Sequence, residues 1–413
     1  MQFYIDPGTG SMLFTILIGV LGAAFYAMRG AAMKLRFLLS GGAQQKEDNS
    51  NTLPYVIFSD DKRYWNVFGP ICREFDKRGI PAVYMTASED DPALNESFDH
   101  VQCQFIGAGN KAFAKLNLLH ADILLATTPG LDVYQWKRSK DVKFYAHILH
   151  MASDATLYRM FGLDYFDSIL LSGEYQIAPE RKLEAMRNLP AKELVVVGQP
   201  YMDGLLERLH AAGNQEDAHQ TTVLLAPSWG PSSILNRFGK QAIQSLLDTG
   251  YHVIVRPHPQ SYASEKELLD TLTAAFPNSD QLEWNRDNDN FEVLRRSDIM
   301  ISDFSGVMFD FALVFNKPVI YADTSFDTAP YDACWLDEET WTFSTLPKIG
   351  QHLSAENLPH IKDVIDSCLQ DSQYAEGREA ARQEAWANIG HSAEKTVEYL
   401  VAKHAELCAK TEA

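Results

Sequence analysis

Short β-rich runs alternate with longer amphipathic stretches along this chain, and the alternation restarts once. The apolar runs of the first half lie at 55–59, 81–86, 121–128, 142–149, 168–173 and 193–198. A polar stretch interrupts the series at 210–220. The apolar runs that follow it lie at 222–227, 252–259, 298–306 and 318–323. Strands that alternate with helices predict βαβ units and largely parallel sheets.

A chain of 413 residues is too long for one hydrophobic core. The restart therefore predicts an α/β protein with two Rossmann-like domains that face a cleft, over 54–212 and 221–380, followed by helices over 381–413. In parallel sheets of this kind, ligands bind beyond the carboxyl ends of the strands. Chemically active residues are therefore sought in the segments that directly follow strands.

The first forty residues differ in character from the rest. Residues 7–28 carry no charge and, as a helix, would span about 33 Å, enough to cross a bilayer core of about 30 Å. A cleaved signal peptide normally opens with positive charge, whereas here Asp6 is the only charge before the run. Arg29, Lys34 and Arg36 follow the run, so the positive-inside rule places the N-terminus outside and the remainder in the cytoplasm. We expect a single-pass anchor over 1–40 and a linker over 41–53.

Charge and cysteine usage exclude several classes of protein. The formal net charge is −19, which disfavours a nucleic-acid partner because such proteins need a basic face. The five cysteines are scattered without a CxxC pair, which argues against a disulfide framework and against a zinc cluster. No other metal-ligand spacing or cofactor-binding motif is found, and we expect neither a metal nor a cofactor.

The segment SDIMISDFSGVMFDFALVFN contains the strongest motif. A buried strand is expected to end at Asp303 and a helix to begin near Ser305. The free N–H groups of Ser305, Gly306 and Val307, together with the helix dipole, would then form an anion site suited to pyrophosphate. Gly306 would let a phosphate approach the backbone closely. The alternative interpretation is that Ser305 is a helix cap and Gly306 a turn residue.

Two other strand ends carry groups that can bind phosphate. In RPHP, Arg256 offers a bidentate fork, and His258 can donate to a phosphoryl oxygen or exchange a proton. In APSWG, Ser228 could reach a phosphate or cap the next helix.

Two histidines end the run VKFYAHILH. Either His147 or His150 could serve as a general base for an alcohol, since the unperturbed pKa of histidine is about 6.5. Residues three apart on a strand point to opposite faces, so at least one of the two is expected to be structural.

Taken together, these motifs resemble the CDP-glycerol glycerophosphotransferases, the family of teichoic-acid primases and polymerases. The resemblance covers most of 120–400 and also includes GQPYMD and the C-terminal NIGHSAEKTVEYL. It implies a GT-B fold with an N-terminal acceptor domain and a C-terminal nucleotide-donor domain. An acceptor hydroxyl would attack the phosphorus bonded to glycerol, and CMP would leave. The resemblance implies that His150 is the base. It further implies that Arg256, His258, Ser305 and the Gly306 amide are pyrophosphate ligands, with Asp303 orienting the turn. Our candidate catalytic residues are therefore His150 and His258, and Ser228 is a further candidate phosphate ligand.

The chain departs from the usual family pattern at three places. Phe304, Ser305 and Gly306 stand where Tyr-Ser-Ser is usual, and Leu149, His150 and Met151 stand where Trp-His-Gly is usual. Tyr201 replaces an arginine that is typical of the GxPR turn. Two alternative functions are a UDP-sugar 2-epimerase-like enzyme of the same fold and a catalytically inactive, membrane-tethered binding protein.

The expected partners follow from the resemblance and the anchor. The donor is CDP-glycerol or a similar nucleotide such as CDP-ribitol, and the acceptor is a lipid-linked glycan or primer of cell-envelope polymer synthesis. The protein is therefore expected at the cytoplasmic membrane, with its catalytic domains in the cytoplasm.

The predicted anchor can be tested by topology. A C-terminal reporter that is active only in the periplasm should stay silent, and deletion of residues 1–40 should release soluble, folded protein. Strong periplasmic reporter activity would contradict this orientation.

Overall fold

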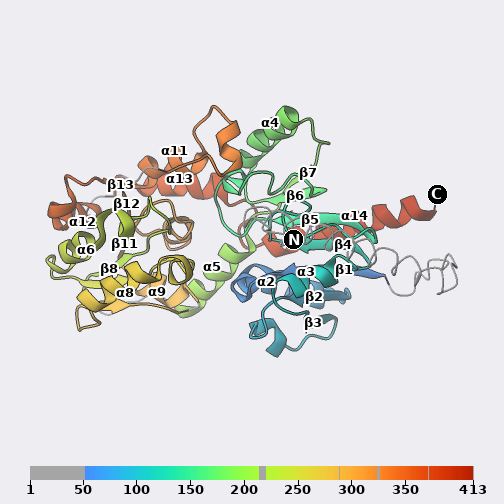
Figure 1. The fold of residues 1–413 in the computed structure, drawn as a ribbon, viewed down its shortest axis with the longest axis horizontal. Coiled ribbons are helices and arrows are strands. Elements are labelled where there is room, and N and C mark those ends of the chain that lie inside the picture. The colour runs from blue at the N-terminus through green and yellow to red at the C-terminus, as the bar shows by residue number, and fades with distance from the viewer. Residues whose placement is uncertain (1–51, 214–219, 288, 323–325, 371, 413) are drawn as a thin grey trace, which may run out of the picture. The chain divides into compact units, whose positions relative to one another are not determined.

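The computed structural model describes residues 52–213, 220–287, 289–322, 326–370 and 372–412 (Figure 1). The predicted membrane anchor and most of the predicted linker lie outside these residues. Within the described part of the chain, no helix is both long enough and apolar enough to cross a membrane.

The first lobe is built on a seven-stranded parallel sheet with the order β3-β2-β1-β4-β5-β6-β7. Its strands are β1 (Leu53–Ser59), β2 (Ala82–Thr86), β3 (Val101–Phe105), β4 (Ala121–Ala126), β5 (Val142–Ile148), β6 (Ser168–Leu171) and β7 (Glu193–Val196). Most of these strands are buried along their length because helices cover both faces of the sheet.

The second lobe repeats the same winding in a six-stranded parallel sheet of order β10-β9-β8-β11-β12-β13. Its strands are β8 (Thr222–Leu225), β9 (His252–Val255), β10 (Leu282–Trp284), β11 (Ile299–Ser302), β12 (Val319–Ala322) and β13 (Gly350–Leu353). The predicted α/β fold with two parallel sheets is confirmed. Each sheet reverses its winding direction once, between β1 and β4 and between β8 and β11, and such points are where doubly wound sheets bind ligands.

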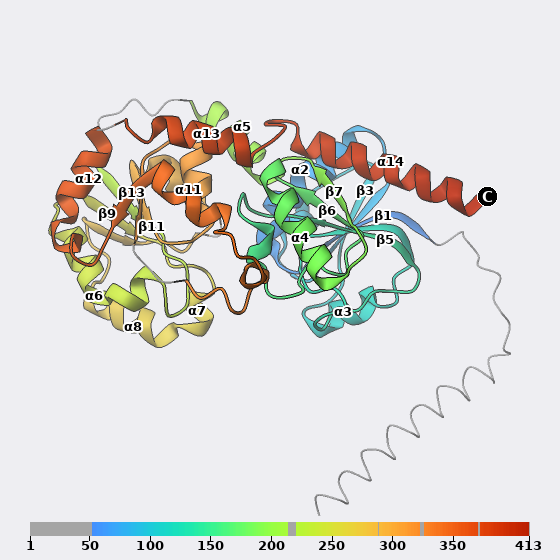
Figure 2. The ribbon, with the colours of Figure 1, turned by 90° about the horizontal axis from the view of Figure 1, so that it is seen from above.

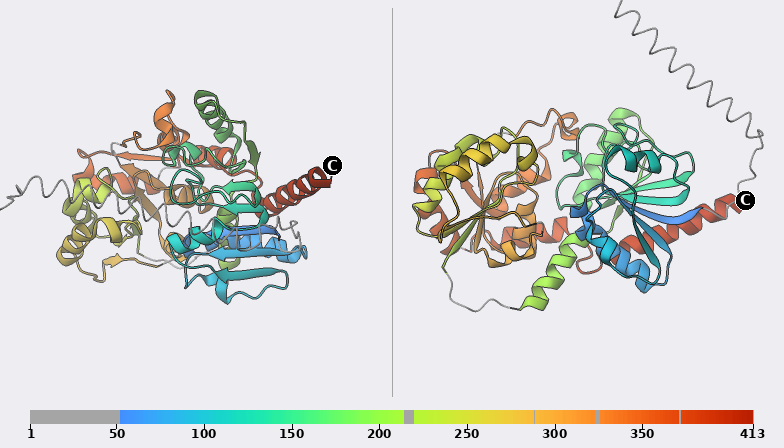
Figure 3. Two further views of the ribbon diagram at one scale, coloured as in Figure 1. Left: turned by 45° about the vertical axis from the view of Figure 1, so that its right-hand side comes forward. Right: turned by 60° about the horizontal axis from the view of Figure 1, so that its bottom comes forward.

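Helices cover both faces of the first sheet (Figures 2 and 3). One face packs against α2 (Trp65–Lys77) and α14 (Ser392–Glu412), and α5 (Pro200–Ala212) packs against these two helices. The other face packs against α3 (Asn110–Leu116) and α4 (Ile177–Arg187). The C-terminal helix α14 therefore returns to the first lobe.

The second sheet is covered in the same way. The helices on one face are α6 (Ile234–Leu247), α8 (Lys266–Ala275) and α12 (Ile361–Gln370). Those on the other are α9 (Phe291–Arg296), α10 (Val307–Phe309), the π-helical turn η6 (Asp310–Val314), α11 (Trp341–Ile349) and α13 (Ala375–Ala385). The latter core also includes Met202 and Leu205 of α5 and Ala152 of the first lobe, so apolar packing is continuous between the lobes.

The GQPYMD motif joins α5 to the chain that leads into α14. The Asp203 carboxylate accepts hydrogen bonds from the indole N–H of Trp386 and from the backbone N–H groups of Gly390 and Ser392, each at 2.8 Å. Gly198 has φ +96°, and a Cβ there would lie 2.1 Å from the Ala387 carbonyl oxygen. Two motifs of the family resemblance, GQPYMD and NIGHS, therefore pack on each other in a structural role.

The buried carboxylate of Asp154 joins the two lobes. Asp154 follows β5 in the first lobe, and its Oδ1 accepts from the backbone N–H of Trp341 at 2.9 Å. Its Oδ2 accepts from the backbone N–H of Thr342 at 2.7 Å and from the Thr342 hydroxyl at 2.6 Å. Asp154 thus supplies acceptors for the first turn of α11, where the helix dipole favours a negative charge.

The Asp154 contact generates a stability prediction. We expect Asp154→Ala to lower the free energy of unfolding by roughly 2–4 kcal/mol, because buried N–H donors of α11 lose their acceptor. Thr342→Val removes one hydroxyl only and should cost about 1 kcal/mol. Urea unfolding of both variants, with the exposed Asp141→Ala as a control, would measure this. Equal stability of Asp154→Ala and wild type would show that the contact contributes nothing.

Candidate active site

A cavity of about 400 Å³ lies where the two switch points meet. The first lobe contributes Arg63 and Tyr64, which follow β1, and His150 and Met151, which follow β5. The second lobe contributes the segments after β8, β9 and β11. Of the residues predicted for the site, those that line the cavity are His150, Arg256, His258, Ser305 and Gly306.

His150 is held by two hydroxyl groups. Its Nδ1 lies 3.1 Å from the Thr127 hydroxyl and 3.0 Å from the Tyr158 hydroxyl. With the proton on Nδ1 donated to either oxygen, Nε2 carries a free lone pair. Burial, and then the positive charge of Arg63, lower the pKa of His150 to about 4. The imidazole is therefore neutral at physiological pH and can accept a proton.

His258 has the opposite hydrogen-bonding arrangement. Its Nδ1 accepts from the backbone N–H of Gln260 at 3.1 Å, so in the neutral ring Nε2 carries the hydrogen and can donate it. Burial and the charge of Arg63 lower the pKa of His258 to about 4. The neutral ring is thus a hydrogen-bond donor, which fits a role in contacting a phosphoryl oxygen.

Arg256 positions the loop after β10 as well as lining the cavity. Its guanidinium donates to the Asn285 side chain, to the Asp287 carbonyl at 2.7 Å and to the Asn290 side chain at 2.5 Å. The fork predicted to bind phosphate is therefore largely occupied by loop acceptors. Its remaining N–H groups and its positive charge are what it can offer a ligand.

The conformation of the SDFSG turn is fixed by the buried carboxylate of Asp303. Its Oδ1 accepts from the N–H groups of Ser228 at 2.9 Å and Phe304 at 2.7 Å, and Oδ2 accepts from Ile234 at 3.0 Å. The carboxylate thereby ties the β8–α6 loop to the β11–α10 turn. Asp303 and Ser228 are buried and do not line the cavity.

The turn itself presents backbone donors. Among the described residues, no acceptor is bonded to the N–H groups of Ser305, Gly306 and Val307, which open the helical segment. A Cβ at Gly306 would lie 3.0 Å from Sδ of Met151 in the first lobe. A side chain at position 306 would therefore require the end of the Met151 side chain to move by a few tenths of an ångström.

His147, the other candidate base, lies in the core of the first sheet. Its side chain is 0% exposed, and neither ring nitrogen has a hydrogen-bond partner among the described residues. Its ring packs against Tyr158 and Phe166. It does not line the cavity, whereas His150 does.

Sequence reasoning missed Arg63. This residue follows β1 at the switch point of the first sheet, and Asp61 holds its guanidinium, with Nε 2.8 Å from Oδ1. Its charge acts on both cavity histidines. The switch-point rule, applied to the first strand as well as to later ones, would have found it.

Asp310 was also missed. It lines the cavity from the π-helical turn, and burial raises the pKa of its carboxyl group to about 7, while the Tyr201 hydroxyl acts in the opposite direction. The signal in the sequence is a single carboxylate within the apolar run VMFDFALVF, since an unpaired buried charge is costly.

Residues 150–400 match the family described as CDP-Glycerol:Poly(glycerophosphate) glycerophosphotransferase. The chain belongs to this family. It is thus a CDP-glycerol glycerophosphotransferase-like transferase, as the motifs predicted. No curated protein matches the chain.

Solved structures of low sequence identity share the fold of this glycerophosphotransferase. The wall teichoic acid polymerase TagF with CDPG is 13% identical, with a TM-score of 0.53 over 87% of this chain and 91% of that chain. S. aureus MnaA with UDP is 11% identical, with a TM-score of 0.56 over 86% and 98%. UDP-GlcNAc 2-epimerase from Neisseria meningitidis is 13% identical, with a TM-score of 0.51 over 84% and 99%. The epimerase alternative therefore shares the fold only.

The electrostatics of the cavity generate a pH prediction. His150 must be neutral to act as a base, and a depressed pKa keeps it neutral until the pH falls to about 4. We therefore expect the acid limb that His150 causes in the pH profile of kcat/KM to lie well below pH 6.5. Arg63→Met should move that limb upward, because loss of the positive charge stabilises the imidazolium.

The comparison of Arg63→Met with wild type isolates the effect of Arg63 on the two cavity histidines, His150 and His258. Asp310 also titrates, near pH 7, but it is present in both proteins and cancels in the difference. Lys62→Met is the matched control, because Lys62 pairs with Asp90 and not with the histidines. An acid limb that does not move in Arg63→Met would contradict the assignment.

Proposed function

We propose that this glycerophosphotransferase binds CDP-glycerol in the cavity and transfers glycerol phosphate to a hydroxyl group of a membrane-linked glycan or primer. The proposal rests on one observation. A neutral proton acceptor, Nε2 of His150, and hydrogen-bond donors from the second lobe that can bind phosphate line the same cavity of about 400 Å³. A related polyol phosphate donor, such as CDP-ribitol, would use the same groups.

The donor pyrophosphate is proposed to lie against the SDFSG turn. The N–H groups of Ser305, Gly306 and Val307 and the hydroxyl of Ser305 supply hydrogen bonds, and His258 donates through Nε2. The charges of Arg256 and Arg63 approach from the second and first lobes. These groups are fixed before the ligand arrives, so they can stabilise charge in the transition state with little rearrangement.

The chemical step is an in-line displacement at phosphorus. The acceptor oxygen forms a bond to the phosphorus that carries glycerol, and its proton passes to Nε2 of His150. The bond between that phosphorus and the bridging pyrophosphate oxygen breaks, and CMP leaves with the electron pair. The new negative charge on CMP develops beside the donors of the SDFSG turn.

The acceptor is proposed to be lipid-linked and presented at the cytoplasmic face of the membrane. The support is the uncharged run at 7–28, followed by Arg29, Lys34 and Arg36, together with membership of a family that acts on poly(glycerophosphate). An anchored enzyme meets a membrane-bound acceptor at a high effective concentration.

The role of His150 can be tested by separating turnover from binding. His150→Ala should lower kcat by about 10²–10⁴-fold. The affinity for CDP-glycerol, measured by calorimetry, should change little because the base acts on the acceptor. His391→Ala, an exposed histidine 67% accessible at its side chain, is the control.

Two results would contradict this account. Unchanged turnover in His150→Ala would remove the proposed base. An absence of turnover in wild-type protein that still binds CDP-glycerol would favour the alternative of a membrane-tethered binding protein.

A further inference from the structure

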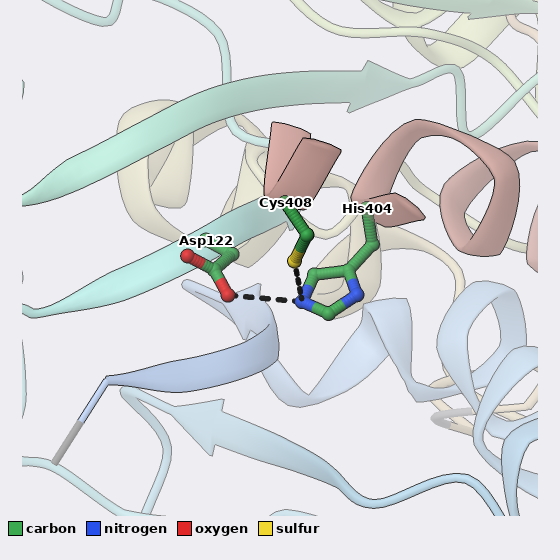
Figure 4. A group of neighbouring side chains, drawn as sticks. All are labelled: Asp122, His404 and Cys408. Carbon is green, nitrogen blue, oxygen red and sulfur yellow. Dashed lines mark hydrogen bonds and ion pairs between the residues drawn. The ribbon is translucent and has the colours of Figure 1, made fainter. Parts of the chain in front are cut away.

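A cluster of three metal-ligating side chains lies on the first lobe, away from the catalytic cavity (Figure 4). Asp122 is the second residue of β4, while His404 and Cys408 lie on α14. Residues four apart on a helix lie on the same face, one turn above the other. Helix packing on the sheet therefore brings together a carboxylate, an imidazole and a thiol that are far apart in the sequence.

The carboxylate and the thiol both approach one nitrogen atom of the imidazole. His404 Nε2 lies 2.9 Å from Oδ2 of Asp122 and 3.7 Å from Sγ of Cys408. A single proton on Nε2 can point at the carboxylate or at the sulfur, and without that proton the nitrogen lone pair would face the carboxylate. One hydrogen bond from Nε2 can therefore account for its contact with the carboxylate or for its contact with the sulfur, but not for both.

We propose that Asp122, His404 and Cys408 bind one divalent transition-metal ion, and that zinc is the ion that fits best. Zinc takes nitrogen, sulfur and oxygen ligands in a tetrahedron. Its usual bond lengths place nitrogen about 3.3 Å from oxygen and about 3.6 Å from sulfur. The observed separations of 2.9 Å and 3.7 Å approach these values, and all three ligand atoms lie within 4.8 Å of one another.

The surroundings support the carboxylate as a ligand. Its second oxygen, Oδ1, forms an ion pair with Nζ of Lys143 on β5 at 2.9 Å, which fixes its orientation. Tyr55 packs against the His404 ring with a centroid separation of 4.9 Å. Asp122 is buried, whereas His404 and Cys408 are partly accessible, so an ion can enter and water can fill the fourth position.

The location indicates a structural role. Asp122 lies near the amino end of β4, whereas Thr127, which contacts His150, follows its carboxyl end. Five residues of strand separate the two by about 16 Å. All three ligands also lie outside residues 150–400, which match the family. The ion would therefore fasten the C-terminal helix α14 to the first sheet and take no part in the transfer step.

Cobalt provides a direct probe of this site. The full chain, stripped with a chelator, is titrated with Co²⁺ while absorbance is recorded, and zinc content is measured separately by mass spectrometry. One equivalent of Co²⁺ should produce tetrahedral d–d bands and a thiolate-to-cobalt charge-transfer band, both displaced by Zn²⁺. Zinc should also raise the melting temperature of the stripped protein.

The variants separate this site from other thiols and histidines. Cys408→Ser should abolish the charge-transfer band while keeping the His404–Asp122 hydrogen bond, and hence the fold. His404→Gln should also abolish binding of one equivalent. The matched controls are Cys334→Ser, at an exposed cysteine, and His391→Gln, at an exposed histidine directly before α14; both should bind as wild type does.

Two results would overturn the proposal. The first is an absence of the cobalt spectrum and of a zinc-dependent rise in melting temperature in wild-type protein. The second is a spectrum that persists unchanged in Cys408→Ser. Because the readout is metal binding and stability, it is independent of whether the cavity transfers glycerol phosphate.

Discussion

The candidate site depends on contacts between the two lobes, in which the buried carboxylate of Asp154 takes part. His150 and Asp154 lie in one short segment of the first lobe, and Asp154 accepts hydrogen bonds from the start of α11 in the second lobe. Asp332 of the second lobe likewise accepts from the backbone N–H of Phe161 at 2.8 Å. Met151 then packs so closely against Gly306 that a side chain at position 306 would force a shift. His150 and the SDFSG turn are thus held at a fixed spacing by contacts between the lobes.

The local charge of the cavity differs from that of the whole chain. A net charge of −19 gives no general attraction for an anionic nucleotide, so binding must rely on local donors. Arg63 and Arg256 supply positive charge there, while burial keeps His150 and His258 neutral. Neutral histidines can exchange or donate protons at physiological pH, and the arginines remain charged throughout. The two kinds of residue are therefore suited to different parts of one reaction.

The sequence predicted the two parallel sheets well because central strands are buried on both faces and read as apolar runs. The strands that it missed, β3, β10 and β13, lie at sheet edges, where strands are short and partly exposed. It also located His150, His258 and the SDFSG turn, since strand ends and motifs are local features. It did not locate Arg63, because the segment after β1 was not searched as a switch point. The contact between Asp122 and His404, 282 residues apart, could be found only in the folded chain.

The fate of the phosphorus atom tests the central claim most directly. CDP-glycerol labelled with ³²P at the phosphorus bonded to glycerol would be incubated with the full-length enzyme and membranes that carry the acceptor. The account predicts that the label enters the acceptor fraction and that an equal amount of unlabelled CMP is released. Release of labelled CDP would mean that glycerol moves without its phosphate and would contradict the account, as would the absence of any nucleotide release.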